Sequence, residues 1–206
     1  FSDGGKFNTT KKANIHIKDM IAGGANIIDV GGESSRPGSK TISNELEWKR
    51  IKSIIKKFKK KNKNTLLSID TRKTEIMKKS SKYKVDIIND VSGFSYDKNA
   101  LGTVLKLNKS NVIHHMQGTP NTMQKNPKYI NVLLDIYDFF EESINSRFFD
   151  KKIIIDPGIG FGKSLKHNLT LISKISLFHS LGFPILIGTS KKRFISQLSG
   201  KHDSID

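Results

Sequence analysis

The sequence predicts an α/β fold in which parallel strands alternate with helices. Short apolar runs recur along the chain, and each is followed by a polar or glycine-containing stretch and then by a helical segment. The runs are rich in Ile, Val and Leu without strict alternation, which is typical of strands covered on both faces. Strands alternating with helices indicate right-handed crossovers and a parallel sheet. An open doubly wound sheet and an incomplete eight-stranded barrel both fit this pattern.

Six strand–helix units are expected. The strands are expected at residues 25–30, 65–69, 85–88, 111–113, 152–155 and 185–187. The helices are expected at residues 10–22, 44–61, 72–82, 97–108, 129–149, 166–181 and 191–198. Apolar side chains in these helical segments recur at spacings that give one apolar stripe. No linker or low-complexity tract interrupts the units, so residues 1–206 are expected to form a single domain.

The net charge of +17 suggests a nucleic-acid partner, but the residue types do not favour one. Only five of the 36 basic residues are arginine, the residue that nucleic-acid binders prefer for bidentate and stacking contacts. The densest basic run, 56–63, ends an expected helix, where cations suit the helix dipole. A solvated lysine surface is therefore expected. The lack of cysteine and of an uncharged apolar run of about 18 residues suits a cytoplasmic protein.

Polar residues gather at the carboxyl end of every expected strand. These segments read IDVGGESSRPGS (28–39), SIDTRK (68–73), IINDVSG (87–93), IHHMQGTPNTMQ (113–124), IIDPGIGFGKS (154–164) and IGTSKKRF (187–194). An α/β barrel builds its site at this end of its strands. Helix capping would account for one or two such segments but not for six. A shared site is therefore predicted.

Together with FSDGG at 1–5, these segments resemble the signature blocks of the dihydropteroate synthases, in the same order and over essentially all 206 residues. The resemblance implies a TIM (β/α)8 barrel, with about six of its eight units present, that binds a pterin in its mouth. It also implies a transferase of folate biosynthesis. The enzyme would condense 6-hydroxymethyl-7,8-dihydropterin pyrophosphate with p-aminobenzoate, which gives 7,8-dihydropteroate and pyrophosphate.

The resemblance assigns the pterin site to five residues of this sequence. Asp156 matches the carboxylate that accepts hydrogen bonds from the ring amide and the exocyclic amine of the pterin. Asp70 and Asn89 complete the polar rim. Lys192 matches the lysine that donates to the pterin carbonyl near the p-aminobenzoate, and Asp70 and Lys192 are the expected catalytic residues. Phe161 is expected beside the pterin, with an ordinary core position equally open.

The other two groups of the reaction are assigned in the same way. Ser35 and Arg36 match the hydroxyl and the arginine that hold the pyrophosphate, and Phe1, Pro37 and Lys192 are expected to line the p-aminobenzoate site. Sulfonamides, which mimic p-aminobenzoate, should compete there. Pyrophosphate would leave the pterin methylene, and the amine would attack that carbon. A Mg²⁺ ion shared with the pyrophosphate fits the need to stabilise leaving-group charge.

Parts of the family pattern lie beyond the sequence. The asparagine that meets magnesium would precede Phe1, so no metal ligand is expected within these residues, and the R-x-H pair would follow Asp206. We therefore expect a fragment that lacks the first and eighth strands and is inactive and poorly stable alone. Family members often form homodimers, and the sequence points to no interface.

Several alternatives are open. A pterin-dependent methyltransferase would lack the ESSRPGS loop, a non-catalytic barrel would keep only pterin binding, and a nucleic-acid-binding module would use the basic charge. Within the predicted site, Lys163 is expected at the surface or at a helix start, because its segment lacks phosphate-loop spacing. His114 and His115 are expected to order a loop rather than bind a metal, because adjacent strand residues point to opposite faces.

Overall fold

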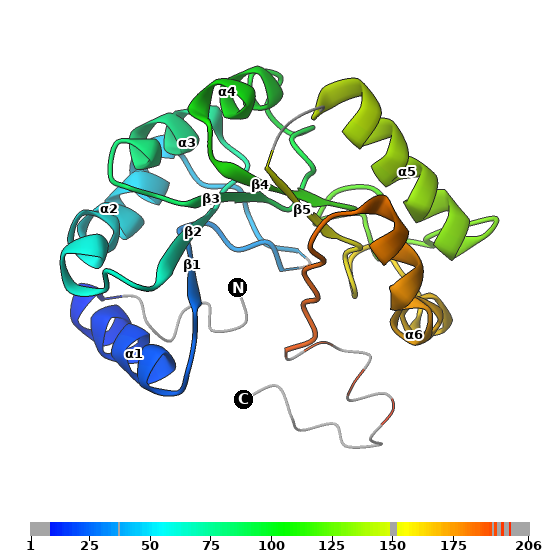
Figure 1. Cartoon of the computed structure of the whole chain (residues 1–206), viewed down its shortest axis with the longest axis horizontal. Coiled ribbons are helices and arrows are strands. Elements are labelled where there is room, and N and C mark those ends of the chain that lie inside the picture. Colours follow the sequence, from blue (N-terminus) through cyan, green and yellow to red (C-terminus); the bar gives the residue numbers. More distant parts are fainter. Residues whose placement is uncertain are drawn as a thin grey trace.

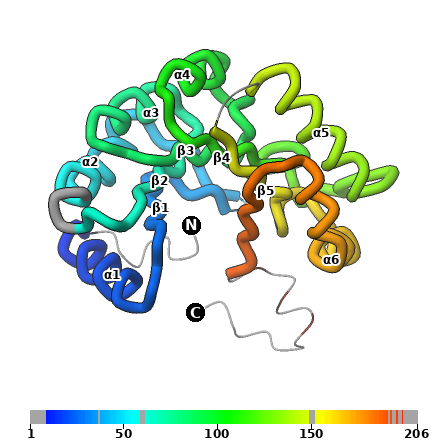
Figure 2. Tube along the Cα trace, viewed as in Figure 1, coloured from blue at the N-terminus to red at the C-terminus, as the bar shows by residue number. Residues whose placement is uncertain are grey.

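The protein was analysed as a computed structural model that describes residues 9–36, 38–148, 152–190, 192, 195 and 198, without the side chains of 59–61. Five parallel strands form one sheet in the order of the sequence. They are β1 (Ile27–Gly31), β2 (Leu66–Asp70), β3 (Ile87–Asp90), β4 (Ser110–His114) and β5 (Ile153–Asp156). Figure 1 shows the helices arranged around the outer side of this sheet, and the Cα trace in Figure 2 follows the same arc. The predicted α/β class is confirmed.

Each crossover carries a helix close to its predicted position. The helices are α1 (Thr10–Ala22), α2 (Asn44–Lys61), α3 (Thr74–Ser81), α4 (Ala100–Leu107), α5 (Val132–Arg147), α6 (Leu165–Ser173) and the 3₁₀ helix η1 (Ile175–Leu181). The side chains of Thr9, Ser43, Asn131 and Ser164 cap the starts of α1, α2, α5 and α6. Such caps satisfy backbone N–H groups that lack a partner within the helix. The single helix expected at 166–181 is interrupted at Lys174, whose φ of −120° is not helical.

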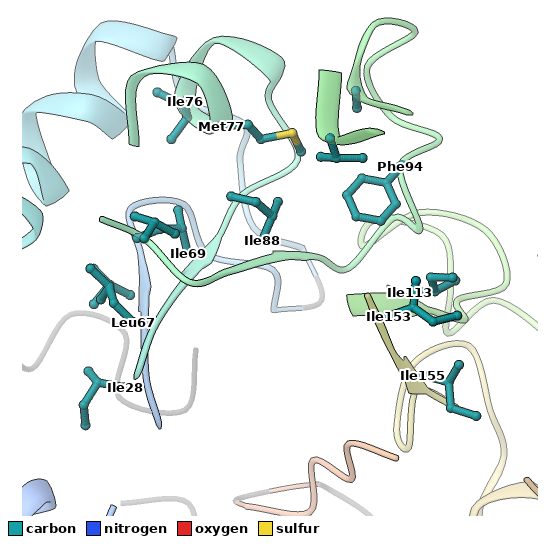
Figure 3. Close-up of a cluster of buried hydrophobic side chains, with 14 of the residues drawn as sticks. Ile28, Leu67, Ile69, Ile76, Met77, Ile88, Phe94, Ile113, Ile153 and Ile155 are labelled. Atoms are coloured by element: carbon teal, nitrogen blue, oxygen red, sulfur yellow. The ribbon is translucent and has the colours of Figure 1, made fainter. Parts of the chain in front are cut away.

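The main core lies between the strands and the outer helices. Ile69 and Ile88 of the sheet and Ile76 and Met77 of α3 have no exposed surface, and Figure 3 shows the two α3 side chains beside those of the strands. Burying each such side chain stabilises the fold by about 1.5–3 kcal/mol. This packing fixes the strands and therefore the positions of their polar ends.

The sixth expected strand, at 185–187, forms only an isolated bridge between Ile155 and Ile185. The N–H of Ile155 donates to Pro184 O, and the N–H of Leu186 donates to Ile155 O, at 2.9 and 2.8 Å. The next bond of a parallel ladder would need an N–H from Pro157, which has none. The prediction of a full sixth strand is therefore wrong for the described residues. Most of the helix expected at 191–198 lies outside them.

Candidate active site

The ends of β1, β2 and β3 bring carboxylate and amide groups together. In the strand register Gly31 pairs with Asp70, and Asp70 pairs with Asn89, so the predicted Asp70 and Asn89 are neighbours. The amide of Asn89 donates to Asp29 Oδ2 at 3.4 Å. Burial, followed by the nearby charge of Asp29, raises the pKa of Asp70 well above its ordinary value. Sequence reasoning missed Asp29, which lies in the middle of β1 rather than at its end.

Asp156, the last residue of β5, is held in one orientation by the loop that follows it. Its Oδ1 accepts a hydrogen bond of 2.8 Å from the N–H of Gly158. Burial raises the pKa of Asp156 to about 6, against the lowering effects of that bond and of Lys192. Gly158 has a φ of +69°, and a Cβ there would lie 2.0 Å from the His115 carbonyl oxygen. Only glycine fits this turn.

His114, at the end of β4, lies beside Asp156 without forming an ion pair. Its Nδ1 is 2.8 Å from the carbonyl oxygen of Val91, so this nitrogen carries the proton and donates. Burial lowers the pKa of His114 well below its ordinary value, which keeps the ring neutral. Its Nε2, an acceptor in that tautomer, lies 3.9 Å from Asp156 Oδ2. His114 therefore ties the β3 and β4 ends together, as expected for a loop-ordering residue.

Phe161 and Lys192 complete this half of the site. The ammonium of Lys192 lies 4.1 Å from the centre of the Phe161 ring. Burial lowers the pKa of Lys192 to about 8, and the nearby carboxylate of Asp156 opposes this shift by favouring the charged amine. Phe161 also packs with Val91 and Met123 in a small apolar cluster separate from the main core. Three loops thus supply one apolar surface at the strand ends, and sequence reasoning identified only Phe161 in it.

The loop after β1 lies over the end of β2. Ser35 is 5% exposed, and its Oγ has no hydrogen-bond partner among the described residues. It lines a small cavity with Asp70, Arg72 and Val91. An unsatisfied buried hydroxyl is costly unless a ligand or water binds it. Arg36, the other predicted pyrophosphate residue, has an exposed side chain, whereas the predicted Phe1 and Pro37 lie outside the described residues.

The predicted residues therefore form two groups at the same edge of the sheet. Ser35, Asp70 and Asn89 lie at the β1–β3 ends, and Asp156 and Lys192 lie at the β5 end. Val91 joins the groups, because it lines the cavity near Asp70 and also contacts Phe161 and His114.

Lys163 lies directly before Ser164, the cap of α6, so its predicted place at a helix start is confirmed, whereas the surface alternative is wrong because the side chain is buried. It is 3% exposed, and its ammonium donates to Phe161 O at 2.9 Å, to His115 O at 3.3 Å and to His115 Nδ1 at 3.1 Å. Burial lowers the pKa of Lys163 to about 7 and that of His115 to about 3. Lys163 thus fastens the loop after β5 to the loop after β4.

Two other features bear on ligands. Within the described part of the chain, no three acidic, histidine or cysteine side chains are grouped to hold a metal ion, and no helix is long and apolar enough to cross a membrane. A wider groove lies on α2 and α3 and is lined by Trp48 and several lysines. We base the site on the strand ends, because the buried carboxylates, the unsatisfied hydroxyl and the glycine turns are there.

Comparisons with known proteins agree with this geometry. The profile of the family described as pterin binding enzyme matches residues 1–205. A dihydropteroate synthase of Escherichia coli (strain K12) is 39% identical over 202 residues, which are 96% of this chain and 71% of that protein. The dihydropteroate synthase of Yersinia pestis, solved with a sulfonamide drug complex, superposes with a TM-score of 0.92 at 34% identity, over 97% of this chain and 74% of the other.

A second solved relative is the dihydropteroate synthase of Xanthomonas albilineans with 4-aminobenzoic acid. It superposes with a TM-score of 0.87 at 33% identity, over 100% of this chain and 73% of that one. These structures confirm that the arc of strands and helices is part of a TIM barrel. The chain belongs to the pterin-binding enzyme family and, within it, to the dihydropteroate synthases.

Proposed function

We propose that the polar strand ends of this chain bind the pterin pyrophosphate and p-aminobenzoate for the dihydropteroate synthase reaction. The observation that carries the assignment of residues is the buried carboxylate of Asp156. Its Oδ1 accepts one hydrogen bond, from the N–H of Gly158. Its Oδ2 faces the unprotonated Nε2 of the neutral His114, which donates no hydrogen bond to it. Such a carboxylate is poised to accept the two adjacent donors of a pterin edge.

The groups around Asp156 suit the rest of a flat, polar heterocycle. The ammonium of Lys192 lies next to the Phe161 ring, where it would donate to the pterin carbonyl. Phe161, Val91 and Met123 would contact the ring face. Asp70 and Asn89 lie across Val91 from this group and would meet the remaining polar atoms of the pterin.

Ser35 and Arg36 are proposed to hold the leaving group. The unsatisfied hydroxyl of Ser35 would donate to a phosphate oxygen, and Arg36 can approach phosphate with two parallel N–H groups. In the proposed step, the bond between the pterin methylene carbon and the pyrophosphate oxygen breaks, and pyrophosphate leaves with the electron pair. The amine of p-aminobenzoate forms the new C–N bond and loses its proton to solvent. Positioning and charge stabilisation are the contributions expected of the protein.

Turnover of the purified full-length protein tests the proposal. Incubation with both substrates should release pyrophosphate and form dihydropteroate in equal amounts. A sulfonamide should compete with p-aminobenzoate but not with the pterin substrate. Saturable pterin binding without turnover would favour a non-catalytic barrel, and salt-sensitive retention on DNA without pterin binding would favour a nucleic-acid-binding module.

Mg²⁺ is proposed as the cofactor. Among the described residues no three histidine, cysteine or acidic side chains are grouped to hold a metal ion, so no step of the reaction is derived through the ion. The pyrophosphate oxygens would be its main ligands, because Mg²⁺ prefers phosphate and carboxylate oxygens. Chelation with EDTA should abolish turnover, and added Mg²⁺ should restore it. Undiminished turnover in EDTA would refute this part of the proposal.

A cytoplasmic location and a homodimer are also proposed. The location rests on the lack of cysteine and on the substrate chemistry, and the dimer on the family resemblance alone. Cell fractionation and sedimentation of the purified full-length protein test them separately.

A further inference from the structure

Arg72 is a buried arginine at the end of β2 that the proposed reaction does not use. Its side chain is 10% exposed, and its Nη2 donates to Glu33 Oε2 at 2.9 Å. The guanidinium also lies 4.1 Å from the centre of the Tyr96 ring, in the loop after β3. Arg72 thus joins the loops that follow β1 and β3, on either side of its own strand.

Glu33 is the point through which Arg72 acts on the β1 loop. Glu33 Oε1 accepts a 2.9 Å bond from the N–H of Ile42 and a 3.1 Å bond from Lys73 Nζ. The carboxylate therefore connects position 33 with position 42 and holds both against the end of β2. Although burial would raise it, the pKa of Glu33 is lowered by these hydrogen bonds and by Arg72, so the carboxylate stays charged. Ser35 and Arg36 lie within the segment that is closed in this way.

We propose that Arg72 is a positioning residue that, through Glu33, holds the 33–42 loop so that Ser35 and Arg36 meet the pyrophosphate of the substrate. The inference rests on the proposed function, because it gives Arg72 a role in binding that leaving group. An arginine fits this role better than a lysine, because its planar guanidinium bonds to the carboxylate with one edge while its face stacks on Tyr96. The pterin ring itself is bound by other residues.

The test separates binding of the pyrophosphate from binding of the pterin. Arg72→Met should raise the KM for the pterin pyrophosphate and the Kd for inorganic pyrophosphate by about tenfold. The Kd for 6-hydroxymethyl-7,8-dihydropterin, which has no phosphate, should stay unchanged. Arg72→Lys should recover part of the loss. Equal weakening of both ligands would show a general structural defect and overturn the inference.

Glu33→Gln distinguishes positioning from direct phosphate contact. If Arg72 acts through Glu33, this variant should weaken pyrophosphate binding at least as much, and the Arg72→Met/Glu33→Gln double variant should be no worse than Glu33→Gln alone. Unchanged or tighter pyrophosphate binding by Glu33→Gln would show that Arg72 contacts the phosphate itself, which overturns the inference. Lys79→Met, which removes an exposed ion pair with Glu75 on α3, is the matched control and should change nothing.

The order of the 33–42 loop can be measured without substrate, from its rate of cleavage by trypsin. Lys40 is exposed within the 33–42 loop, and trypsin does not cut after Arg36 because proline follows it. Arg72→Met should speed cleavage after Lys40 about tenfold, whereas Lys79→Met should not. An unchanged cleavage rate overturns the inference even if the protein has no synthase activity, so the two failures are distinguishable. If Arg72→Met does not fold, Tyr96→Leu replaces it as the test, because Tyr96 is exposed. This variant is expected to speed cleavage after Lys40 severalfold, and an unchanged cleavage rate would also overturn the inference.

Discussion

The two halves of the candidate site are ordered by different interactions. At the β1–β3 ends, side-chain charges hold the loops, since Glu33 pairs with Arg72 and Lys73, and Lys73 also pairs with Glu47 at 2.8 Å. At the β4–β5 ends, close backbone contacts hold them. Gly158 and Gly162 approach the backbone of residues 115 and 117 so closely that neither position accepts a Cβ.

This difference implies that the loops of the two halves differ in how easily they can move. A loop held by ion pairs can be loosened by removing one charge while the strands beneath it stay in place. A loop held by contact between backbones has no such freedom, because any added atom displaces the neighbouring loop. We infer that the β4–β5 half supplies the rigid surface for the pterin, and that the loop after β1 supplies the adjustable seat for the leaving group.

Gly158→Ala is expected to have the largest effect and would break the rigid half. The added Cβ would lie 2.0 Å from His115 O, at a φ of +69° that L residues rarely adopt. Steric overlap and backbone strain together should lower the free energy of unfolding by about 3–5 kcal/mol. Urea unfolding measures this. Gly102→Ala, inside α4 with nothing within 4 Å, should instead stabilise by up to about 1 kcal/mol. Equal effects of both variants would refute the steric argument.

Asp156→Asn should have the next largest effect and acts on ligand binding. Asparagine keeps one acceptor oxygen but loses the charge that strengthens the hydrogen bonds to the pterin. The expected loss is about 2–3 kcal/mol, roughly 30- to 140-fold in kcat/KM. Steady-state kinetics with a thermal unfolding control measure it. A change of less than threefold would remove Asp156 from the pterin site.

The pH dependence of pterin binding sharpens the same assignment. The pKa of Asp156 is about 6 in the folded protein, so its carboxylate is charged above pH 6 and protonated below it. Because the charged form binds, the association constant for the pterin should fall about tenfold per pH unit below pH 6. The Asp156→Asn variant should lose this step. Binding that is flat from pH 7 to 5 would contradict the assignment.

Much of this fold was predictable because its signals are local. Apolar runs followed by polar residues or glycine marked β1 to β5, and parallel strands necessarily bring such ends to one edge. The place of Asp70, Asn89 and Asp156 at that edge could be predicted for that reason, whereas their roles in binding a pterin were implied by the family resemblance. The absence of a full sixth strand also has a local cause, because Pro157 has no N–H to continue the ladder. Predicting this from sequence would require knowing which residue of β5 pairs with position 186.

The unpredicted parts depend on contacts between distant segments. Val91 and Met123 have the same residue types as a core, so only the structure shows that they form a cluster with Phe161 apart from the main core. The pairing of Arg72 with Glu33 spans 39 positions of sequence. The burial of Lys163 could not be predicted because two of its three hydrogen-bond partners are backbone oxygens, which every sequence offers at every position.

Lys163→Met is expected to have the smallest effect at neutral pH. The folded protein lowers the pKa of Lys163 to about 7 from its ordinary value of 10.5. Methionine fills similar volume without a charge, so the lost hydrogen bonds and the removed burial cost should nearly cancel, leaving a change within about 1 kcal/mol at pH 7. Urea unfolding at pH 7 measures this change.

The sign of the pH effect makes Lys163→Met informative. Between pH 7 and 10.5 the unfolded chain keeps the Lys163 proton that the folded protein releases, so this residue makes stability rise with pH. The rise should reach about 1.4 kcal/mol per pH unit, and the variant should lack it. The difference between the parent and the variant should therefore grow from pH 7 to pH 9. A constant difference would mean that Lys163 keeps its ordinary pKa, and then the fastening of the β5 loop could not depend on a buried amine.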